Sequence, residues 1–165
     1  MTPNNEHSAQ ASGRDLPIST RHSIDIARCI RGKSMEKSVA LLQRVLEKKE
    51  AVPAVRFRQD IPHRPGRISS GRYPQKATKT ILSLLNAAQA NAENKGLDAQ
   101  NLVVKTIIAN KASRPYRTGR IRGIRARRTH IQIIVEEKEI KESVQTKRVA
   151  HKKQQEQIQP KEKKA

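Results

Sequence analysis

The sequence is poor in aromatic and sulfur-containing side chains. Of its 165 residues, 2% are aromatic, there is no tryptophan, and Cys29 is the single cysteine. One cysteine excludes a disulfide framework and a cysteine-based zinc site in this chain, and it suits a reducing compartment. The shortage of aromatic rings argues against modules that stack single-stranded bases on aromatic platforms. We expect Cys29 to be a small buried helix residue rather than a nucleophile.

Long apolar runs are also missing. No stretch approaches the ~20 apolar residues that a membrane-spanning helix needs, and no segment sets a basic face against a Trp, Phe and Leu face. The first residues, MTPNNEHSAQASGRDLP, are polar and lack the apolar core of a secretory signal. The sequence therefore predicts no membrane anchor, and we expect residues 1–18 to form a flexible extension.

Acidic residues are absent between Asp98 and Glu136, and the whole chain is strongly basic. Its 35 lysines and arginines outnumber 15 aspartates and glutamates, which gives a net charge of +20. Self-repulsion of this size destabilises a compact state unless another molecule supplies counter-charge. The expected partner is therefore a polyanion: RNA, DNA or, least favoured, an anionic membrane surface.

Catalytic and metal-binding motifs are missing as well. Residues 32–34 read Gly-Lys-Ser, like the end of a phosphate-cradling P-loop, but that motif requires glycine where Ala27 stands and a strand before it. The five histidines are scattered, and the carboxylates are too dispersed to nominate an acid–base pair. We therefore expect no enzymatic activity, no catalytic residue, no cofactor and no metal.

Three helices are predicted before residue 97 from apolar spacing and end signals. The first follows Ser19 or Thr20 and ends at Gly32, the second follows Ser34, and the third runs from Pro74 to Gly96. Between the second and third, residues 53–74 carry prolines, glycines and arginines and predict an irregular basic loop. The expected inner faces are Ile26, Ala27 and Ile30; Met35, Val39, Leu42 and Leu46, with Leu41 and Val45 beside them; and Ala77, Ile81, Leu84, Ala88 and Ala92.

The apolar period changes to two after residue 101. Alternation over residues 102–108 and again over 130–137 predicts two strands, which residues 101–137 join into a hairpin much longer than the core requires. Residues 140–165 are charged and glutamine-rich and predict a tail. The predicted fold class is α+β: three helices packed on a small antiparallel sheet with a long protruding β-hairpin, spanning residues 19–139, with disordered basic ends.

Arginines dominate the segment between the two predicted strands. A charge run is usually a solvated surface, but this one is purely basic and is flanked by strands. Because arginine binds phosphate oxygens bidentately, we interpret it as a polyanion-binding segment. A DNA-architectural protein with a basic β-arm in the minor groove is the alternative, and an RNA-processing enzyme would need a residue cluster that the sequence does not offer. The candidate RNA-binding residues are Arg56, Arg58, Arg64, Arg67, Arg72, Lys76, Lys111, Arg114, Arg117, Arg120, Arg122, Arg125, Arg127 and Arg128.

Four stretches together resemble one protein family: IRGKS at residues 30–34, GRYPQKA at 71–77, NAENKGLD at 91–98, and YRTGRI to THI over 116–131. In this order and spacing they resemble the universal large-subunit ribosomal protein family called L twenty-two in bacteria and L seventeen in eukaryotes. The inserted loop between the second and third helices resembles the archaeal and eukaryotic form. The resemblance implies a structural protein of the large ribosomal subunit, located in the cytoplasm, and in the nucleolus during assembly if the source is a eukaryote.

The same resemblance implies partners and site residues. The partners would be large-subunit ribosomal RNA, neighbouring ribosomal proteins and the nascent polypeptide, because the family's hairpin threads between RNA segments and lines the peptide exit tunnel. Arg72 and Lys76 fall on the family's loop-to-helix motif. This hairpin is about one residue shorter than the family's, and its returning arm is richer in arginine. The residues expected at the tunnel-facing tip are Tyr116, Arg117, Thr118, Gly119 and Arg120.

Overall fold

The computed structural model describes residues 7–55, 60–66, 68–120 and 123–138. Helices and strands within these ranges follow the predicted α+β pattern. Their order is β1 (Ser8–Leu16), α1 (Thr20–Ile30), α2 (Met35–Leu46), β2 (Val52–Pro53), β3 (Gly71–Arg72), α3 (Gln75–Asn94), the short 3-10 helix η1 (Ala99–Asn101), β4 (Leu102–Lys111) and β5 (Thr129–Glu137). The proposed tail, residues 140–165, lies outside the described residues.

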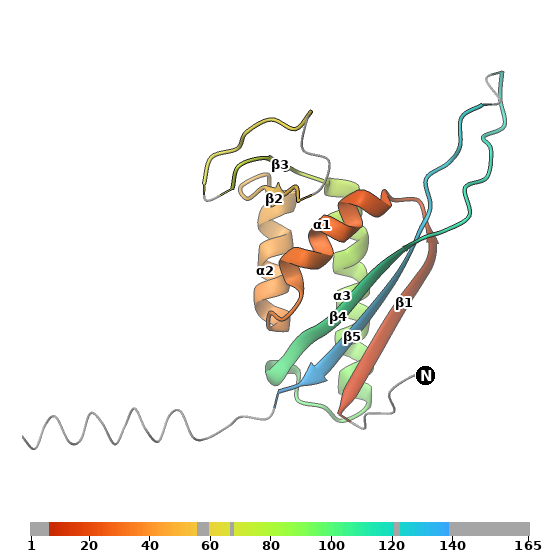
Figure 1. The fold of residues 1–165 in the computed structure, drawn as a ribbon. Coiled ribbons are helices and arrows are strands. Elements are labelled where there is room, and N and C mark those ends of the chain that lie inside the picture. Colours follow the sequence, from red (N-terminus) through yellow and green to blue (C-terminus); the bar gives the residue numbers. More distant parts are fainter. Residues whose placement is uncertain (1–6, 56–59, 67, 121–122, 139–165) are drawn as a thin grey trace, which may run out of the picture.

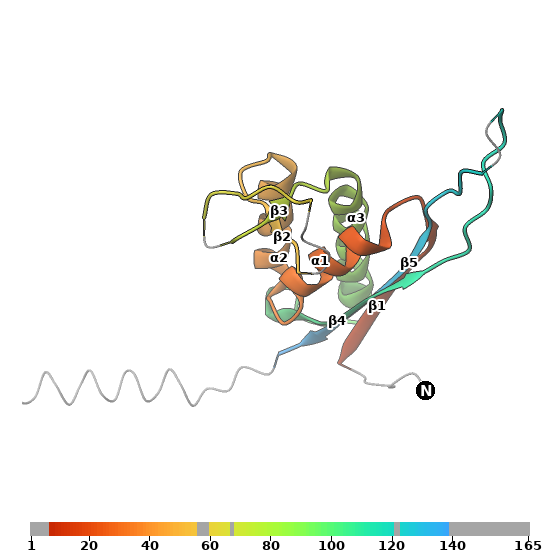
Figure 2. The same cartoon turned by 45° about the horizontal axis from the view of Figure 1, so that its top comes forward.

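One antiparallel sheet carries the three helices on a single face. Its strand order is β1-β5-β4, so β5 lies in the centre, while β2 and β3 form a separate two-stranded pair. Helix α3 packs against β1 and β5, α1 packs against β4, and α2 packs beside α3 (Figure 1). The turned view shows the same arrangement, with the sheet as one layer and the helices as the other (Figure 2).

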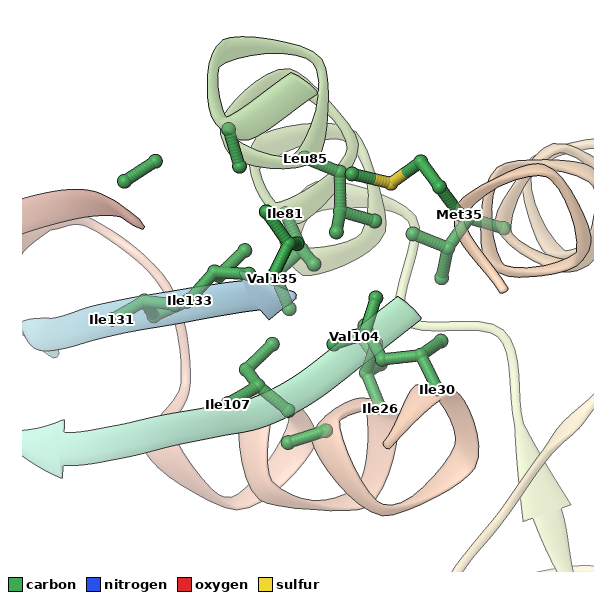
Figure 3. Packing of buried hydrophobic residues seen from close by; sticks show 14 of the residues in the cluster. Ile26, Ile30, Met35, Ile81, Leu85, Val104, Ile107, Ile131, Ile133 and Val135 are labelled. Carbon is green, nitrogen blue, oxygen red and sulfur yellow. The ribbon is translucent and has the colours of Figure 1, made fainter. Parts of the chain in front are cut away.

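The core lies between the sheet and the helices. Figure 3 shows isoleucines of α1 and α3 pointing toward the strands, with Met35 of α2 beside Leu85 at one end. Each fully buried Ile, Leu or Val side chain contributes about 1.5–3 kcal/mol relative to exposure, so this cluster dominates the stability of the fold. Its fully buried members include Ile26, Ile30, Leu42, Val45, Ile81, Leu85, Val104, Ile107, Ile131, Ile133 and Val135.

The predicted inner faces of the helices are confirmed with small shifts. In α2, Val39 and Leu46 are only half-buried, whereas Leu41 and Val45 belong to the buried set. In α3, Leu85 is buried in place of Leu84. Residues three and four positions after Ile81 lie on the same side of a helix, so the sequence alone could not choose between the two leucines. Leu85 lies beside Met35 of α2 (Figure 3), and Leu84 packs beside Gly13 of β1.

The prediction of a flexible extension over residues 1–18 is wrong for the described part. Residues 8–16 form β1, which pairs with β5 from Ser8 opposite Glu136 to Gly13 opposite Ile131. The inward residues are Ala9 and Ala11, and alanine is a poor strand former that adds little hydropathy, so the alternation was overlooked. Residues 1–6 lie outside the described residues.

Side chains of α3 cover acceptors on the outer edge of β1. Lys95 Nζ donates a 2.8 Å hydrogen bond to the backbone oxygen of Ser8, and Asn91 Nδ2 donates a 2.9 Å bond to that of Gln10. Covered edges pair less readily with other strands.

The Gly-Lys-Ser stretch is a structural turn between α1 and α2. Gly32 has φ +76°, a left-handed conformation that suits glycine. Its N–H donates to the Val104 oxygen at 2.8 Å, and Val104 N–H donates to the Lys33 oxygen at 2.9 Å. The turn therefore docks on the edge of β4, in agreement with its exclusion as a phosphate loop.

The protruding hairpin is confirmed, but its outer half is not regular sheet. Strands β4 and β5 pair as far as Lys111 and Thr129, and the segment beyond them, residues 112–128, projects from the body (Figures 1 and 2). We call this segment the arm. Its described backbone hydrogen bonds from one side to the other are few: Ala112 N to Arg128 O (3.1 Å), Ala126 N to Pro115 O (2.9 Å) and Arg117 N to Ile124 O (2.9 Å).

Candidate nucleic-acid interface

The arm presents cations and no carboxylate. Its described arginines are exposed apart from Arg128, which is half-buried. The ion pairs seen within the described residues join Arg44 to Glu50, Lys49 to Glu47 and Lys105 to Glu136, so none involves an arm arginine. In the described part of the arm these arginines are Arg114, Arg117, Arg120, Arg125, Arg127 and Arg128.

Where the arm leaves the body, cations surround an open cleft of about 330 Å³. Three segments distant in sequence meet there: the start of α1, Arg72 of β3, and the base of the arm. We call it the basic cleft. It is lined by Ser19, Thr20, Arg21, His22, Arg72, Lys111, Arg114, Arg127 and Arg128.

Buried hydrogen bonds fix the start of α1 to the base of the arm. The Thr129 hydroxyl donates to the backbone oxygen of Ile18 at 3.1 Å. Because its single proton is used there, the Thr20 hydroxyl donates to Thr129 Oγ1. Thr129 is fully buried. The helix start and the arm base are therefore held in one arrangement, which gives the cleft its shape.

The start of α1 adds positive potential to the cleft. The first N–H groups of a helix have no acceptor inside the helix and form the positive end of its dipole. In α1 the Ser19 side chain makes no capping hydrogen bond, and the first turn has no acidic residue. Arg21 and His22 occupy this turn instead. Such a helix start attracts anions.

The titration of His22 reflects this potential. Burial lowers the pKa of His22, and Arg72, Arg127 and Arg21 lower it further, while Asp25 opposes them. Its imidazole is therefore held in the neutral form more strongly than in a free peptide. In the same helix, burial raises the pKa of Asp25, although the carboxylate accepts a hydrogen bond from the backbone of Val55.

The structure brings together only some of the residues predicted to bind RNA. Arg72, Lys111, Arg114, Arg127 and Arg128 line the basic cleft. Others lie outside it: Arg117, Arg120 and Arg125 lie on the arm, Lys76 is exposed in the first turn of α3, and Arg64 stacks 5.2 Å from the centroid of the Tyr73 ring. Arg56, Arg58, Arg67 and Arg122 lie outside the described residues.

The expected tip residues occupy two different positions. Thr118, Gly119 and Arg120 lie in the turn that follows the Arg117–Ile124 hydrogen bond. Tyr116 lies earlier, opposite Arg125. The Arg125 guanidinium lies 4.5 Å from the Tyr116 ring centroid and donates to its hydroxyl. This cation–π contact and hydrogen bond stabilise the arm just before its turn.

Sequence reasoning missed the part of the cleft that α1 contributes. Ser19 and Thr20 were predicted only as helix caps, His22 only as one of several surface or RNA-facing histidines, and Arg21 was given no role. A local signal was available, because cations in the first turn of a helix oppose its dipole and so call for another explanation. Which other segments join them could not be read from spacing.

Other functional chemistry finds little support in the described residues. They contain no group of three His, Cys, Asp or Glu side chains placed to hold a metal ion. No helix among them is long and apolar enough to cross a membrane. Cys29 of α1 packs half-buried against the core, and burial raises the pKa of its thiol, which disfavours the reactive thiolate.

Known proteins similar to this chain support the family resemblance seen in its sequence. Residues 11–136 match the family model described as ribosomal protein L22p/L17e. The chain is 41% identical over 136 residues to the large ribosomal subunit protein uL22 of Methanococcus aeolicus, covering 78% of this chain and 89% of the relative. It is 41% identical over 141 residues to uL22 of Nanoarchaeum equitans, with 80% of each chain covered. The match with uL22 of Archaeoglobus fulgidus is 46% identical over 105 residues, 62% of this chain and 68% of the relative. The chain belongs to the ribosomal protein L22p/L17e family.

Proposed function

We propose that this protein is a structural, non-enzymatic component of the large ribosomal subunit that binds ribosomal RNA. In this proposal the basic cleft and the loop of residues 53–74 anchor the body, and the arm threads between RNA segments. The turn of the arm lines the peptide exit tunnel and meets the nascent polypeptide. The relatives named above carry the name of a large-subunit protein, which supports this assignment.

The arm is the observation that carries the proposal. It projects from the body with exposed arginines, no carboxylate and few crossing hydrogen bonds. An arm of this kind gains little from folding alone, because its charges repel one another and it buries almost no apolar surface. Phosphate groups on two sides would supply both counter-charge and hydrogen-bond acceptors, which arginine engages bidentately.

The chemistry of the interface favours structured RNA. Double-stranded and folded RNA is recognised through shape and through phosphate and ribose contacts, which require cations rather than aromatic platforms. The chain has 2% aromatic residues, and the two tyrosine rings already carry Arg64 and Arg125 against them. We therefore expect backbone contacts to dominate over base stacking.

Two variants tested together separate anchoring from tunnel lining. In the anchor variant Arg64, Arg72 and Lys76 become alanine, and in the turn variant residues 118–123 are replaced by Asn-Gly. Asn-Gly closes a two-residue hairpin turn, and Arg117 and Ile124 are already hydrogen-bonded across the arm. A control variant changes Arg28, Lys37 and Lys79, three exposed cations on α1, α2 and α3, to alanine.

Incorporation into large subunits is measured by sedimentation in high salt. The anchor variant should incorporate poorly, since each lost charge-assisted contact costs about 1.5–3 kcal/mol. The turn variant should incorporate normally but alter pausing on stalling peptides. The assignment of roles is wrong if the turn variant fails to incorporate while the anchor variant incorporates like the control. Association with duplex DNA in place of ribosomal particles would favour the DNA-architectural alternative.

A further inference from the structure

The basic cleft combines four features that an anion-binding site requires. It is open to solvent, it has six lysine and arginine side chains on its walls, it includes the start of an eleven-residue helix, and two of its three wall segments, the start of α1 and the base of the arm, are hydrogen-bonded to each other. These features lie at the point where the arm meets the body. We propose that the basic cleft binds one phosphodiester group of the RNA backbone and thereby fastens the arm to α1 and β3.

This inference rests on the proposed RNA-binding function and adds a place, a ligand group and residues. Arg21 and His22 are the added residues, because neither lies in the arm or in the loop of residues 53–74. The ligand group is a single phosphodiester. Donors from α1, from Arg72 of β3 and from both sides of the arm base can contact the same phosphate, so one phosphate is enough to join these three segments. The remaining arm arginines are then free to follow the RNA further out.

Donors converge on the cleft from different directions. The backbone N–H groups of the first turn of α1 belong to the positive end of the helix, where phosphate groups bind readily. Arg72 comes from β3, and Arg114 and Arg127 come from the outgoing and returning sides of the arm. Planar guanidinium groups can each give two parallel hydrogen bonds to phosphate oxygens. The open form of the cleft leaves room for the ribose units on either side of the phosphate.

The empty cleft is electrostatically costly, and a phosphate removes that cost. Among the described residues, the cleft is lined by no carboxylate. Cations at this spacing repel one another, and the lowered pKa of His22 shows that an added positive charge is disfavoured there. A bound phosphate would reverse the local potential. The free protein thus holds a preformed site rather than one that must assemble on binding.

Proton uptake should accompany phosphate binding. In the free protein burial lowers the pKa of His22 most, Arg72, Arg127 and Arg21 lower it further, and Asp25 acts in the opposite direction. Lys111, Arg114 and Arg128 are the other cations that line the cleft. A phosphate beside His22 raises its pKa. The complex therefore binds more protons than the free protein, and affinity rises as the pH falls through the range in which His22 titrates.

The first test uses nuclear magnetic resonance on the full-length protein with the dinucleotide UpU, which has one phosphodiester. UpU should shift the backbone amide signals of Thr20, Arg21 and His22 in a saturable way. Uridine, which has no phosphate, is the control at matched ionic strength, and inorganic phosphate is the third probe. Shifts with UpU but not with uridine support the proposal. Equal shifts with uridine, shifts with inorganic phosphate alone, or no shifts overturn it.

The second test compares matched variants in binding to a short oligouridylate. Arg21→Gln and Arg28→Gln remove the same charge from exposed positions of α1, but only Arg21 lines the cleft. Arg21→Gln should weaken binding about fivefold and reduce the log–log salt slope by about 0.7, as expected for one single-strand phosphate contact. Arg28→Gln should leave the slope unchanged. Equal losses in both variants would show general attraction instead of a site.

The third test concerns the histidine. Wild-type affinity for the oligouridylate should increase between pH 8 and pH 6, and His22→Gln should flatten this dependence. An unchanged pH dependence in His22→Gln would show that His22 is not part of the site.

Failure of the cleft proposal and failure of the proposed function are distinguishable. If the cleft variants bind RNA and enter large subunits like wild type, only the cleft proposal falls, whereas a wild-type protein absent from large subunits refutes the proposed function.

Discussion

Thr20 Oγ1 lies 2.8 Å from Thr129 Oγ1, so the first residue of α1 is hydrogen-bonded to the first residue of β5, 109 positions later in the chain. Thr129 also donates to the Ile18 oxygen just before the helix. One buried hydroxyl therefore joins the segment that follows β1, the start of α1 and the base of the arm. The stability of the fold depends in part on this contact.

Replacing Thr129 with valine should test that dependence. Valine keeps the shape, but it removes the donor to the buried oxygen of Ile18 and the acceptor for the half-buried Thr20 hydroxyl. We expect a loss of about 1–3 kcal/mol in the free energy of unfolding, measured by urea denaturation. Thr80→Val is the matched control, because the Thr80 hydroxyl bonds only to the Lys76 oxygen of its own helix at an exposed position. Equal losses would contradict a special role for Thr129.

Asp25 should make stability depend on pH in the acid range. Asp25 is 8% exposed, and burial raises the pKa of its carboxyl from the usual 3.8. A raised pKa in the folded state means that the charged form costs stability above that pKa, and that the cost disappears as the pH falls below the unfolded value. Asp25→Asn should therefore be more stable than wild type at neutral pH, and the two should converge below pH 3.8.

Denaturation curves across this pH range provide the measurement. Asp60→Asn, a change at an exposed loop position, is the control and should follow wild type more closely. A wild-type protein more stable than Asp25→Asn at neutral pH would show that the Val55 hydrogen bond outweighs burial.

Salt should weaken RNA binding steeply through the arm. Each phosphate neutralised contributes roughly 0.7–0.9 to the slope of log affinity against log salt. Changing Arg117, Arg120 and Arg125 to glutamine should therefore reduce the slope for a ribosomal RNA fragment by about 2. The control changes Arg28, Lys37 and Lys79, which removes the same charge from the helices. A wild-type slope near zero, or equal reductions in both variants, would contradict binding through the arm.

Strong local signals in the sequence were sufficient for most of the fold. The helical stripes around Ile26, Leu42 and Ile81 and the alternation around Ile133 are dense enough in large apolar residues to identify their elements. Strand β1 was missed because Ala9 and Ala11 contribute too little hydropathy. The structure supplied the register that pairs Ala11 with Ile133.

The kind of site could be predicted from the sequence, but its position in the fold could not. Concentrated arginines without carboxylates indicated a polyanion partner, since charge is a property of the sequence itself. The cleft instead depends on contacts between distant segments, such as the bond from Thr20 to Thr129 that sets Arg21 beside Arg127. The pairing of Tyr116 with Arg125 likewise follows from the register of the arm, which no repeat in the sequence specifies.

In the free protein, backbone amides of the hairpin should show slow hydrogen exchange in the paired strands that end at Lys111 and begin at Thr129, and faster exchange in the arm beyond them. Amides of β5 near Ile131 and Ile133 lie between two paired strands over a buried face, so they should exchange only on global opening. The arm has few crossing bonds and mutually repelling arginines, so its amides should exchange by local opening even where bonded, as at Arg117. Ala112 should be intermediate, because its N–H bonds to Arg128 and its side chain is buried.

Bound RNA should protect the amides of the arm from exchange, beginning at the base of the arm and proceeding toward its turn. If phosphate contacts hold the arm, protection should appear first at Ala112 and Ala126, close to the cations of the basic cleft, and then at Arg117 near the turn. The amides of β5 should not change, which makes them the internal control. Protection of the whole arm equal to that of β5 in the free protein would mean that the arm is stable without RNA. The charges of the arm would then not require an RNA partner.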